Sequence, residues 1–267
     1  MLELIQITND PAFAQRCDAL GGFRLFVDLE RLGKAERQAG RNTFISAHQL
    51  EDVARVRAVL RRSPLMVRVN PLHDGTQAEV DAVLARGADS IMLPMFSGRA
   101  QLQAFSDIVA GRVPIVGLLE TGAALAGIDD WIATPGLQEV YVGLNDLHLS
   151  LGCRFMFEPL ADGSVERVGR LARNKGLRFG FGGIARLDEG LLPGRDVLAE
   201  HLRLGSGAVI LSRTFHRDSE MDFEREVAGL REAERALAAR TPGQVEADGQ
   251  RIAERIRSIT AGMAPRP

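Results

Sequence analysis

The sequence predicts an α/β protein built as a single (β/α)₈ TIM barrel with an extra C-terminal helical segment. Its 267 residues, 45% of them apolar, suffice for one core of the size that such barrels have. Short β-branched and apolar runs alternate with longer amphipathic runs, which is typical of βα units and a parallel sheet. Eight short runs are present, the number that closes such a barrel. We expect strands at residues 2–8, 24–30, 65–70, 90–96, 115–121, 139–145, 178–183 and 208–214.

Helices are predicted between the strands, where apolar residues recur at spacings of three and four. The clearest cases are 50–62, 76–87 and 163–176. The short run 43–46 is ambiguous, because it fits either an extra strand or the approach to the next helix. The polar segment 31–43, directly after the second strand, is expected to form a loop over the catalytic rim.

The chain divides into a barrel domain at residues 1–240 and a C-terminal helical extension or tail at residues 241–267. A helical pattern at 221–240 completes the barrel. A Thr-Pro-Gly break then precedes a second helical pattern at 245–260, which a barrel does not require. This segment either packs on a neighbouring subunit or forms a solvated tail.

The composition favours a cytoplasmic protein with a small-molecule ligand. The formal net charge of −2 gives no basic face for nucleic acid. There is no apolar run of 18 residues and no basic segment before the first apolar residues, so neither a membrane span nor a signal peptide is expected. Two cysteines are too few for a disulfide framework, which fits a reducing compartment.

Two of the predicted strands end in a carboxylate, Glu120 after the fifth and Asp146 after the sixth. If these strands are parallel neighbours, both side chains emerge at the same rim of the barrel. Two hard oxygen ligands, with room left for water and substrate, suit a divalent cation such as Mg²⁺ or Mn²⁺, with Co²⁺ or Zn²⁺ as further candidates.

Further polar residues are predicted at the same rim, which hosts the active site in barrels of this class. They are Asp28, Glu30, Arg68, Asn70, Ser212 and Arg213. An arginine beside two or more carboxylates is either part of a site or a purely structural ion pair.

Four sequence blocks resemble those of the HpcH/HpaI aldolase and citrate lyase β-subunit family. They are VRVNPL (67–72), SIMLPMF (90–96), LLETGAAL (118–125) and VGLNDLHLSLG (142–152). FVDLE (26–30) is similar to the corresponding block of the citrate-lyase-like branch. The resemblance extends from about residue 2 to residue 240 and implies the same (β/α)₈ barrel.

The resemblance implies a carbon–carbon lyase that acts through a pyruvate-type enolate. Glu120 and Asp146 would bind the metal, and Arg68 would contact a 2-oxo acid such as pyruvate or oxaloacetate, which reacts with an aldehyde. The backbone N–H groups at residues 143–146 would lie near the substrate carboxylate. Members commonly form homo-oligomers, trimers or hexamers with exchanged C-terminal helices. The expected substrate contacts are Arg68, Asn70, Gly143, Leu144, Asn145 and Arg213.

The sequence departs from the aldolase pattern where the catalytic base is expected. Aldolases of this type carry a His, paired with the Asp, just after the acidic block of strand two, where this chain has Arg31 after Asp28 and Glu30. The candidate catalytic residues are therefore Arg68, Asp28, Glu30 and His48, with Glu30 and His48 as the alternatives for the missing base. Each of these two also has a non-catalytic interpretation: His48 as a helix-capping or surface residue, and Glu30 as a carboxylate that orients Arg68 or a metal-bound water. Leu118 replaces a Gln of the aldolases, as in the citrate-lyase-like branch.

Two other functions therefore stay open. One is a condensing enzyme or transferase that uses phosphoenolpyruvate or an acyl-CoA, since the same enolate chemistry can run toward bond formation. Glycines cluster at 179–183 and 205–207, in the region where barrels commonly bind phosphate. They are compatible with phosphoenolpyruvate as a ligand, although they also suit tight turns. The other is a non-enzymatic barrel that binds a metabolite.

Overall fold

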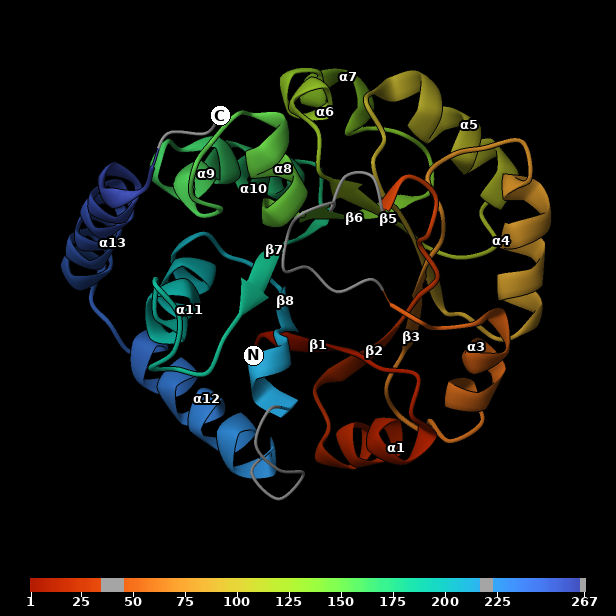
Figure 1. The fold of residues 1–267 in the computed structure, drawn as a ribbon, viewed down its shortest axis with the longest axis horizontal. Helices are drawn as coiled ribbons and strands as arrows, with labels where there is room; N and C mark the ends of the chain where they lie inside the picture. The colour runs from red at the N-terminus through yellow and green to blue at the C-terminus, as the bar shows by residue number, and fades with distance from the viewer. Residues whose placement is uncertain (35–45, 217–222, 265–267) are drawn as a thin grey trace.

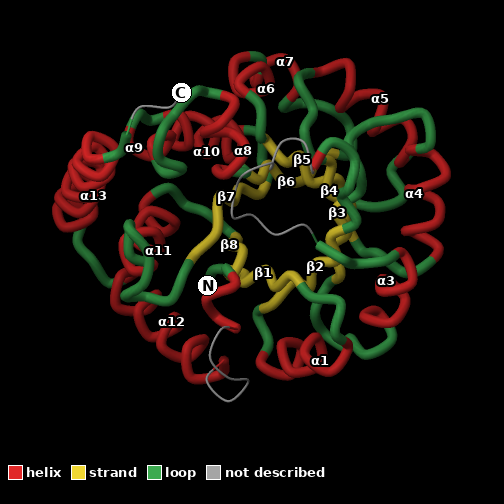
Figure 2. The backbone as a smooth tube through the Cα atoms, viewed as in Figure 1, coloured by secondary structure: helices red, strands yellow, loops and turns green. Residues whose placement is uncertain are grey.

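Eight parallel strands form a closed barrel in sequence order, as the sequence predicts. The computed structural model describes residues 1–34, 46–216 and 223–264. Helices surround the strands as an outer ring (Figures 1 and 2). The strands are β1 (Glu3–Ile7), β2 (Phe23–Asp28), β3 (Leu65–Arg68), β4 (Ser90–Leu93), β5 (Ile115–Leu119), β6 (Leu137–Val142), β7 (Arg178–Ile184) and β8 (Ala208–Leu211).

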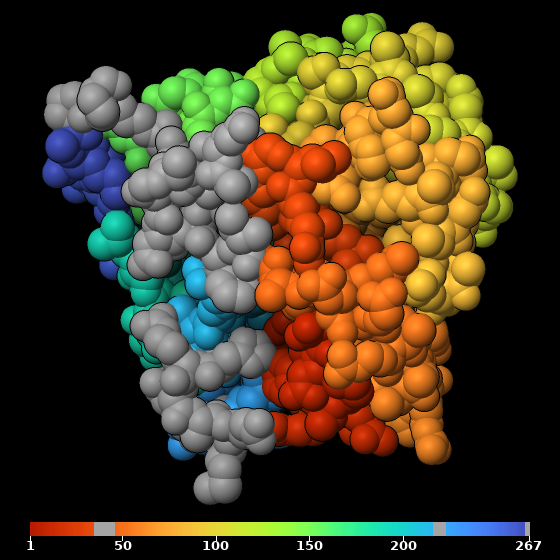
Figure 3. Space-filling view, turned by 45° about the vertical axis from the view of Figure 1, so that its right-hand side comes forward, coloured from red at the N-terminus to blue at the C-terminus, as the bar shows by residue number. Residues whose placement is uncertain are grey.

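The described helices follow the strands in βα order, and several connections contain two or three short helices. In the space-filling view, the described N-terminal residues, coloured red to yellow, lie beside one another on one face (Figure 3). The helices are α1 (Pro11–Leu20), α3 (Leu50–Arg57), α4 (Thr76–Ala85), α5 (Arg99–Val109), α6 (Gly122–Ala126), α7 (Ile128–Trp131), α8 (Leu144–Ser150), α9 (Glu158–Ala161), α10 (Ser164–Asn174), α11 (Gly194–Arg203), α12 (Phe223–Ala238) and α13 (Pro242–Gly262), with a 3₁₀ turn η1 at Arg213–His216.

The strands have two buried faces because alternate residues point into the barrel and toward the helices. The larger apolar cluster fills the space between strands and helices. A smaller one fills the barrel interior and includes Phe26, Met66, Leu118 and Tyr141. Since side chains alternate with a period of two, the next inward position after Phe26 is Asp28, after Met66 is Arg68, and after Leu118 is Glu120. The apolar interior layer thus forms the floor beneath a charged layer.

The positions of the eight strands are confirmed, but most strands end earlier than the sequence pattern indicates. The difference that matters for the site is at β6, which stops at Val142, so that Asn145 and Asp146 lie in the first turn of α8. The apolar pattern runs on without a break from the strand into the helix, and periodicity cannot locate such a boundary. Of the ambiguous run 43–46 the described part is Ser46, which is in a loop; residues 35–43 of the expected loop at 31–43 lie outside the described residues.

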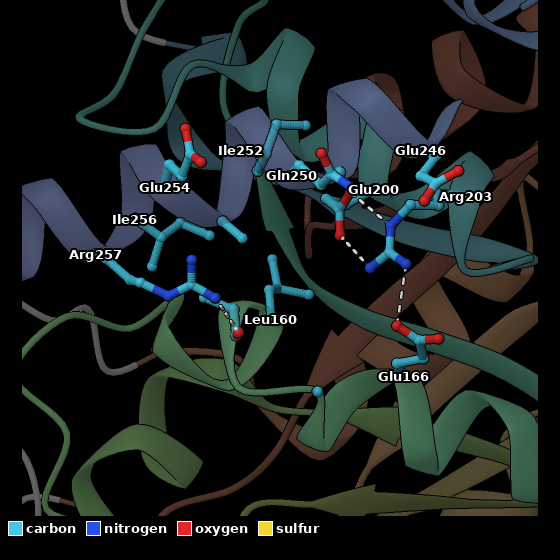
Figure 4. Close-up of a pocket in the computed structure, with 14 residues that line it drawn as sticks. Leu160, Glu166, Glu200, Arg203, Glu246, Gln250, Ile252, Glu254, Ile256 and Arg257 are labelled. Atoms are coloured by element: carbon cyan, nitrogen blue, oxygen red, sulfur yellow. Dashed lines mark hydrogen bonds and ion pairs between the residues drawn. The ribbon is translucent and has the colours of Figure 1, made fainter. Parts of the chain in front are cut away.

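The C-terminal extension forms one long helix, α13, which packs against α9 and α11 of the same chain. A capping box between Thr241 and Gln244 starts it, and its buried side chains include Ile252 and Ile256. Figure 4 shows these two isoleucines beside Leu160 of α9, around a cavity of about 360 Å³. No helix among the described residues is long and apolar enough to cross a membrane.

Candidate functional site

A cavity of about 490 Å³ opens at the carboxyl ends of the strands, the end at which barrels of this class carry their sites. Its floor is formed by barrel-interior side chains, among them Phe26, Met92 and Leu118. The polar and charged residues that line it are Gln6, Asp28, Lys34, Ser46, His48, Arg68, Glu120, Tyr141, Asn145, Asp146, Ser212 and Arg213. The expected substrate contacts Gly143 and Leu144 line it as well.

Arg68 forms a two-pronged ion pair with Asp28. The strand register sets these residues side by side on β2 and β3. Arg68 Nε lies 2.9 Å from Asp28 Oδ1, and Nη2 lies 2.9 Å from Oδ2. Burial by itself would raise the pKa of Asp28, but the charges of Arg68 and Lys34 outweigh burial and hold that pKa well below its usual range. Asp28 therefore stays ionised and fixes the plane of the guanidinium.

The third guanidinium nitrogen of Arg68, Nη1, lies among the other carboxylates of the rim. It is 3.3 Å from Glu30 Oε2 and 3.9 Å from Glu120 Oε1. Arg68 is half-buried, with 14% of its side chain exposed, so water screens its charge poorly. The three surrounding carboxylates raise the pKa of Arg68 more than burial lowers it.

Each carboxylate oxygen of Asp28 accepts two hydrogen bonds, so both are occupied and neither is available to act as a base. Oδ1 accepts from Arg68 and from the backbone N–H of Glu30 at 3.2 Å. Oδ2 accepts from Arg68 and from Lys34 Nζ at 2.8 Å. Asp28 was expected among the catalytic residues; in this structure its oxygens bind Arg68, Lys34 and the backbone N–H of Glu30.

Lys34 is the site residue that sequence reasoning missed. Its ammonium group is buried, with 3% of the side chain exposed, and it also lies 3.3 Å from Glu30 Oε2. The available signal was the spacing in DLERLGK, where a lysine follows Glu30 by four residues. The polar composition of residues 31–43 predicts a loop over the catalytic rim but does not single out Lys34 within it.

His48 lines the cavity although it lies twenty residues after Asp28 in the chain. Its Nδ1 accepts a hydrogen bond from the backbone N–H of Asp28 at 3.1 Å. Burial lowers the pKa of His48 against the opposing charges of Asp28 and Asp52, so the neutral ring is favoured. A neutral ring that accepts at Nδ1 carries its proton on Nε2, which makes His48 a hydrogen-bond donor rather than a free base.

Arg31, which stands where the aldolases have His, is exposed. Its Nη2 donates to the backbone carbonyl of His48 at 2.8 Å. Arg31 and Leu32 also donate their backbone N–H groups to the side-chain oxygen of Asn70, at 2.8 and 2.9 Å. Asn70 in turn donates to Glu79 at 2.7 Å. Asn70, an expected substrate contact, is thus a brace for the segment after β2 and is absent from the cavity lining within the described ranges.

Glu120 is positioned by two backbone features. Met95 donates its N–H to Glu120 Oε2 at 3.3 Å, from a left-handed backbone conformation with φ of 56° that non-glycine residues rarely adopt. Gly143 lies against the other side of the carboxylate: a Cβ at that position would be 2.5 Å from Glu120 Cγ. Gly143 therefore has to be glycine for Glu120 to stand in the cavity.

Asp146 is half-buried and lines the same cavity as Glu120, although it lies in α8. The β5–β6 pairing matches Leu119 with Val142, so the chain segments that carry the two carboxylates leave the sheet side by side. Arg213 is exposed and lies at the cavity's outer part, in η1.

The donor set fits a divalent cation with an incomplete protein shell. Six described charged side chains are buried or half-buried and either line this cavity or pair with Arg68: the carboxylates Asp28, Glu30, Glu120 and Asp146, and the cations Lys34 and Arg68. The formal charges of this set sum to −2, which one divalent metal would balance. No group of three or more His, Cys, Asp or Glu residues in the described ranges could enclose a metal. A hard cation held by two carboxylates keeps its other positions for water and substrate oxygens, which suits Mg²⁺.

The fold and this rim together define a class of protein: a (β/α)₈ barrel with an arginine and several carboxylates around a cavity at the carboxyl ends of its strands. The family model of the HpcH/HpaI aldolase/citrate lyase family matches residues 7–177. The chain belongs to this family, as its sequence blocks predict.

Similar proteins of known sequence or structure include enzymes. The chain is 31% identical over 97 residues to a (3S)-malyl-CoA thioesterase from Cereibacter sphaeroides. That match covers 36% of this chain, and the chain spans about a third, 34%, of the length of the thioesterase.

Two solved structures share the fold at low sequence identity. An HpcH/HpaI aldolase from Desulfitobacterium hafniense DCB-2 is 15% identical, with a TM-score of 0.60 over 90% of this chain and 94% of that protein. The protein CitE from Mycobacterium tuberculosis, solved in complex with magnesium and acetate, is 14% identical, with a TM-score of 0.62 over 93% of this chain and 96% of CitE.

Proposed function

We propose that this protein is a divalent-metal-dependent carbon–carbon lyase of the aldolase type, which acts on a 2-oxo acid through a pyruvate-type enolate. The observation that carries the proposal is the position of Arg68 Nη1 between Glu30 and Glu120, in a cavity that Asp146 also lines. The arrangement combines a fixed positive charge with two candidate metal ligands. This combination suits a reaction in which negative charge develops on a ketone oxygen.

Glu120 and Asp146 would hold the metal, and Mg²⁺ is the first candidate because CitE from Mycobacterium tuberculosis was solved with magnesium. When bound, a divalent metal polarises the ketone oxygen and a carboxylate oxygen of the oxo acid. Mn²⁺, Co²⁺ and Zn²⁺ are the alternatives. The acetate in the CitE complex supports a small carboxylic acid as the ligand of the site.

Arg68 would stabilise the enolate oxygen that forms as the carbon–carbon bond breaks. Asp28 holds its Nε and Nη2, so the guanidinium cannot rotate, and Nη1 keeps a constant position in the cavity. A preorganised charge of this kind acts on the transition state more than on the ground state, because the negative charge on the oxygen grows during the reaction. Asp28 serves the reaction through Arg68.

His48 would donate a hydrogen bond from Nε2 to a substrate oxygen. Its Nδ1 is occupied by the Asp28 N–H, and the neutral ring therefore presents an N–H group rather than a lone pair. The role proposed here differs from that of the His that aldolases carry after strand two. This difference fits the replacement of that His by Arg31.

A second candidate function is a condensing or hydrolytic enzyme that uses an acyl-CoA, or a condensing enzyme that uses phosphoenolpyruvate. The similarity of part of the chain to a (3S)-malyl-CoA thioesterase favours the acyl-CoA version. Both candidates share the metal and Arg68, so they differ in the second substrate. Release of pyruvate from a 2-oxo-4-hydroxy acid supports the lyase, whereas release of coenzyme A or phosphate supports the second candidate.

The metal site is tested with Glu120→Gln and Asp146→Asn, alone and combined. Each change keeps the size of the side chain but removes a negative charge, so Mn²⁺ binding measured by electron paramagnetic resonance should weaken and metal-dependent pyruvate release should be lost. Arg112→Gln is a control, because Arg112 binds Asp81 on the outer surface. Circular dichroism should show that all variants fold. Wild-type turnover in the double variant would exclude the site.

A further inference from the structure

Lys34 occupies an unusual position for this chain. The sequence has 33 lysines and arginines, of which only Lys34 and Lys175 are lysines. Lys175 is exposed, whereas Lys34 is buried at the cavity. All other basic side chains except Lys175 are arginines, whereas a compact ammonium group with three donors lies between Asp28 and Glu30.

The ammonium group of Lys34 is placed by the same carboxylates that place Arg68. Its Nζ lies 2.8 Å from Asp28 Oδ2 and 3.3 Å from Glu30 Oε2. Arg68 contacts these same two oxygens, at 2.9 and 3.3 Å. Two cations therefore share one pair of carboxylates. An ammonium group has three N–H donors, and among the described residues Asp28 and Glu30 account for two of them.

The two cations have different further neighbours. Arg68 Nη1 lies 3.9 Å from Glu120 Oε1, one of the candidate metal ligands. Lys34 pairs with Asp28, and His48 accepts a hydrogen bond from the backbone N–H of the same Asp28. Lys34 and His48 both line the cavity. The cavity thus offers Lys34 and His48 as polar groups in addition to Arg68 and Glu120, and a reaction that joins two carbonyl compounds has a second carbonyl oxygen for them to bind.

We propose that Lys34 is a catalytic residue that donates a hydrogen bond to the carbonyl oxygen of the electrophile, the aldehyde that adds to the enolate. This inference rests on the proposed lyase function. It names the residue that binds the aldehyde, whereas Glu120 and Arg68 are proposed to act on the oxo acid. The Nε2–H of His48 would serve as the second donor to that oxygen. The substrate class is then an aldehyde whose oxygen becomes a hydroxyl in the adduct.

In the condensation direction, the enolate carbon gives its electron pair to the aldehyde carbon, and the new carbon–carbon bond forms. The carbonyl π pair moves onto the aldehyde oxygen, which becomes an alkoxide and takes a proton from water. Lys34 remains an ammonium ion and stabilises the alkoxide while the charge is present. Cleavage is the reverse, in which the hydroxyl proton returns to water.

Lys34 could in principle react with the ketone itself to form an imine, because it is a lysine in an oxo-acid cavity. That reaction needs Nζ as a nucleophile, and in this structure Nζ is held in ion pairs with Asp28 and Glu30 within 3.3 Å. The hydrogen-bond role keeps both of these ion pairs. The two roles give different chemical products, which makes them separable.

The test compares two reactions of Lys34→Met, with Lys175→Met as the matched control. One reaction is metal-dependent exchange of the methyl protons of pyruvate with D₂O, followed by nuclear magnetic resonance, which needs the enolate but no aldehyde. The other is pyruvate release from a 2-oxo-4-hydroxy acid. Losing one donor to a developing oxyanion costs about 10²-fold or more, so Lys34→Met should lower cleavage about 100-fold more than exchange. Lys175→Met should change neither.

An equal loss of both reactions would overturn the proposal, since it would mean that Lys34 acts only by holding Asp28 and Arg68. An unchanged cleavage rate would also overturn it. A wild-type protein without metal-dependent proton exchange would instead refute the lyase function itself. Mn²⁺ binding by electron paramagnetic resonance should be the same in Lys34→Met and wild type.

A measurement on the unmodified protein does not depend on whether the variant folds. The wild type is treated with borohydride in the presence of pyruvate and then digested for mass spectrometry. We expect the peptide that contains Lys34 to keep its mass. A reduced pyruvyl adduct on Lys34 would overturn the hydrogen-bond role in favour of an imine.

Discussion

Asp28 and Arg68 are register partners on adjacent strands, and their side chains join through two contacts of 2.9 Å inside the barrel mouth. This pair connects the whole rim: Asp28 also binds Lys34, and Arg68 also faces Glu30 and Glu120. Its rigidity comes from the strands, because neither residue has to be placed by a loop. The orientation of the guanidinium is therefore a property of the barrel itself.

Arg68→Lys should reduce activity far more than stability. Lysine keeps the charge, but a single ammonium group cannot bind both oxygens of Asp28 and also face Glu120. We expect kcat/KM for pyruvate release to fall about 100-fold. The free energy of unfolding should fall by about 1.5–3 kcal/mol, the contribution of one hydrogen bond to a charged group. Steady-state kinetics and urea denaturation measure the two effects, and an unchanged rate would remove Arg68 from the mechanism.

Gly143→Ala should weaken metal binding without unfolding the barrel. A Cβ at position 143 would lie 2.5 Å from Glu120 Cγ and 2.7 Å from Glu120 Oε1, so the carboxylate has to leave its position. Mn²⁺ affinity, followed by electron paramagnetic resonance, should fall at least about tenfold, the size of effect seen when groups that orient a metal ligand are lost.

Gly229→Ala is the control for Gly143→Ala. Gly229 lies within α12, and no atom stands within 4 Å of the added Cβ. Alanine there should leave Mn²⁺ affinity unchanged and stabilise the helix by up to about 1 kcal/mol. Equal Mn²⁺ affinity in both alanine variants would contradict the account of Glu120.

His48→Gln and His48→Asn should separate a donor from a base. The amide nitrogen of glutamine can replace Nε2–H as a donor, whereas asparagine can replace only Nδ1 as the acceptor for Asp28 N–H. If His48 acts as a donor, kcat should be higher for the glutamine variant than for the asparagine variant. If His48 acts as a base, both variants should lose activity to the same extent. Because burial lowers the pKa of His48, wild-type activity should persist below the pH at which a free histidine becomes charged.

His201→Gln should flatten the loss of stability in acid. His201 is fully buried in α11, where its ring stacks on Phe181 with centroids 3.8 Å apart and its Nδ1 contacts Ser206 Oγ at 2.8 Å. Burial lowers the pKa of His201 from 6.5 to about 3, so the folded state holds the neutral ring. Its contribution to stability is complete above pH 6.5 and declines as the pH falls from 6.5 toward 3.

The corresponding slope is at most about 1.4 kcal/mol per pH unit for one proton. Urea denaturation at a series of pH values measures the free energy of unfolding for wild type and His201→Gln. The wild-type curve should fall more steeply with acid. Parallel curves would show that protonation of His201 does not contribute to acid unfolding.

The barrel and the charged residues at its strand ends could be predicted from the sequence, because both follow from local patterns. A strand alternates its side chains, and an apolar run that ends in a charged residue places that charge at the carboxyl end of the strand. Asp28, Arg68 and Glu120 were found this way, and the structure brings all three together. Asp146 was also expected at this rim and lines the cavity, but from a helix rather than from a strand end.

The sequence could not assign Asn70, Lys34 or the hydrogen-bonding role of His48. Asn70 follows Arg68 by two residues, as an inward residue would, but β3 ends at Arg68 and the Asn70 side chain braces residues 31 and 32. Lys34 and His48 lie in or beside a polar segment without periodicity. Their contacts with Asp28, from Lys34 Nζ to Oδ2 and from the Asp28 N–H to His48 Nδ1, are tertiary contacts that no local pattern records.

The sequence by itself determined the number and order of the strands, the family and the carboxylates and arginine that the strand ends carry, because alternation and helical periodicity act over a few neighbouring residues. The tertiary structure alone decided which side chains form hydrogen bonds and ion pairs with one another. It shows that both oxygens of Asp28 are occupied, that His48 accepts at Nδ1 and so carries its proton on Nε2, and that Lys34 is buried beside Glu30. The physical reason is that hydrogen-bond direction and burial depend on contacts between residues far apart in the chain.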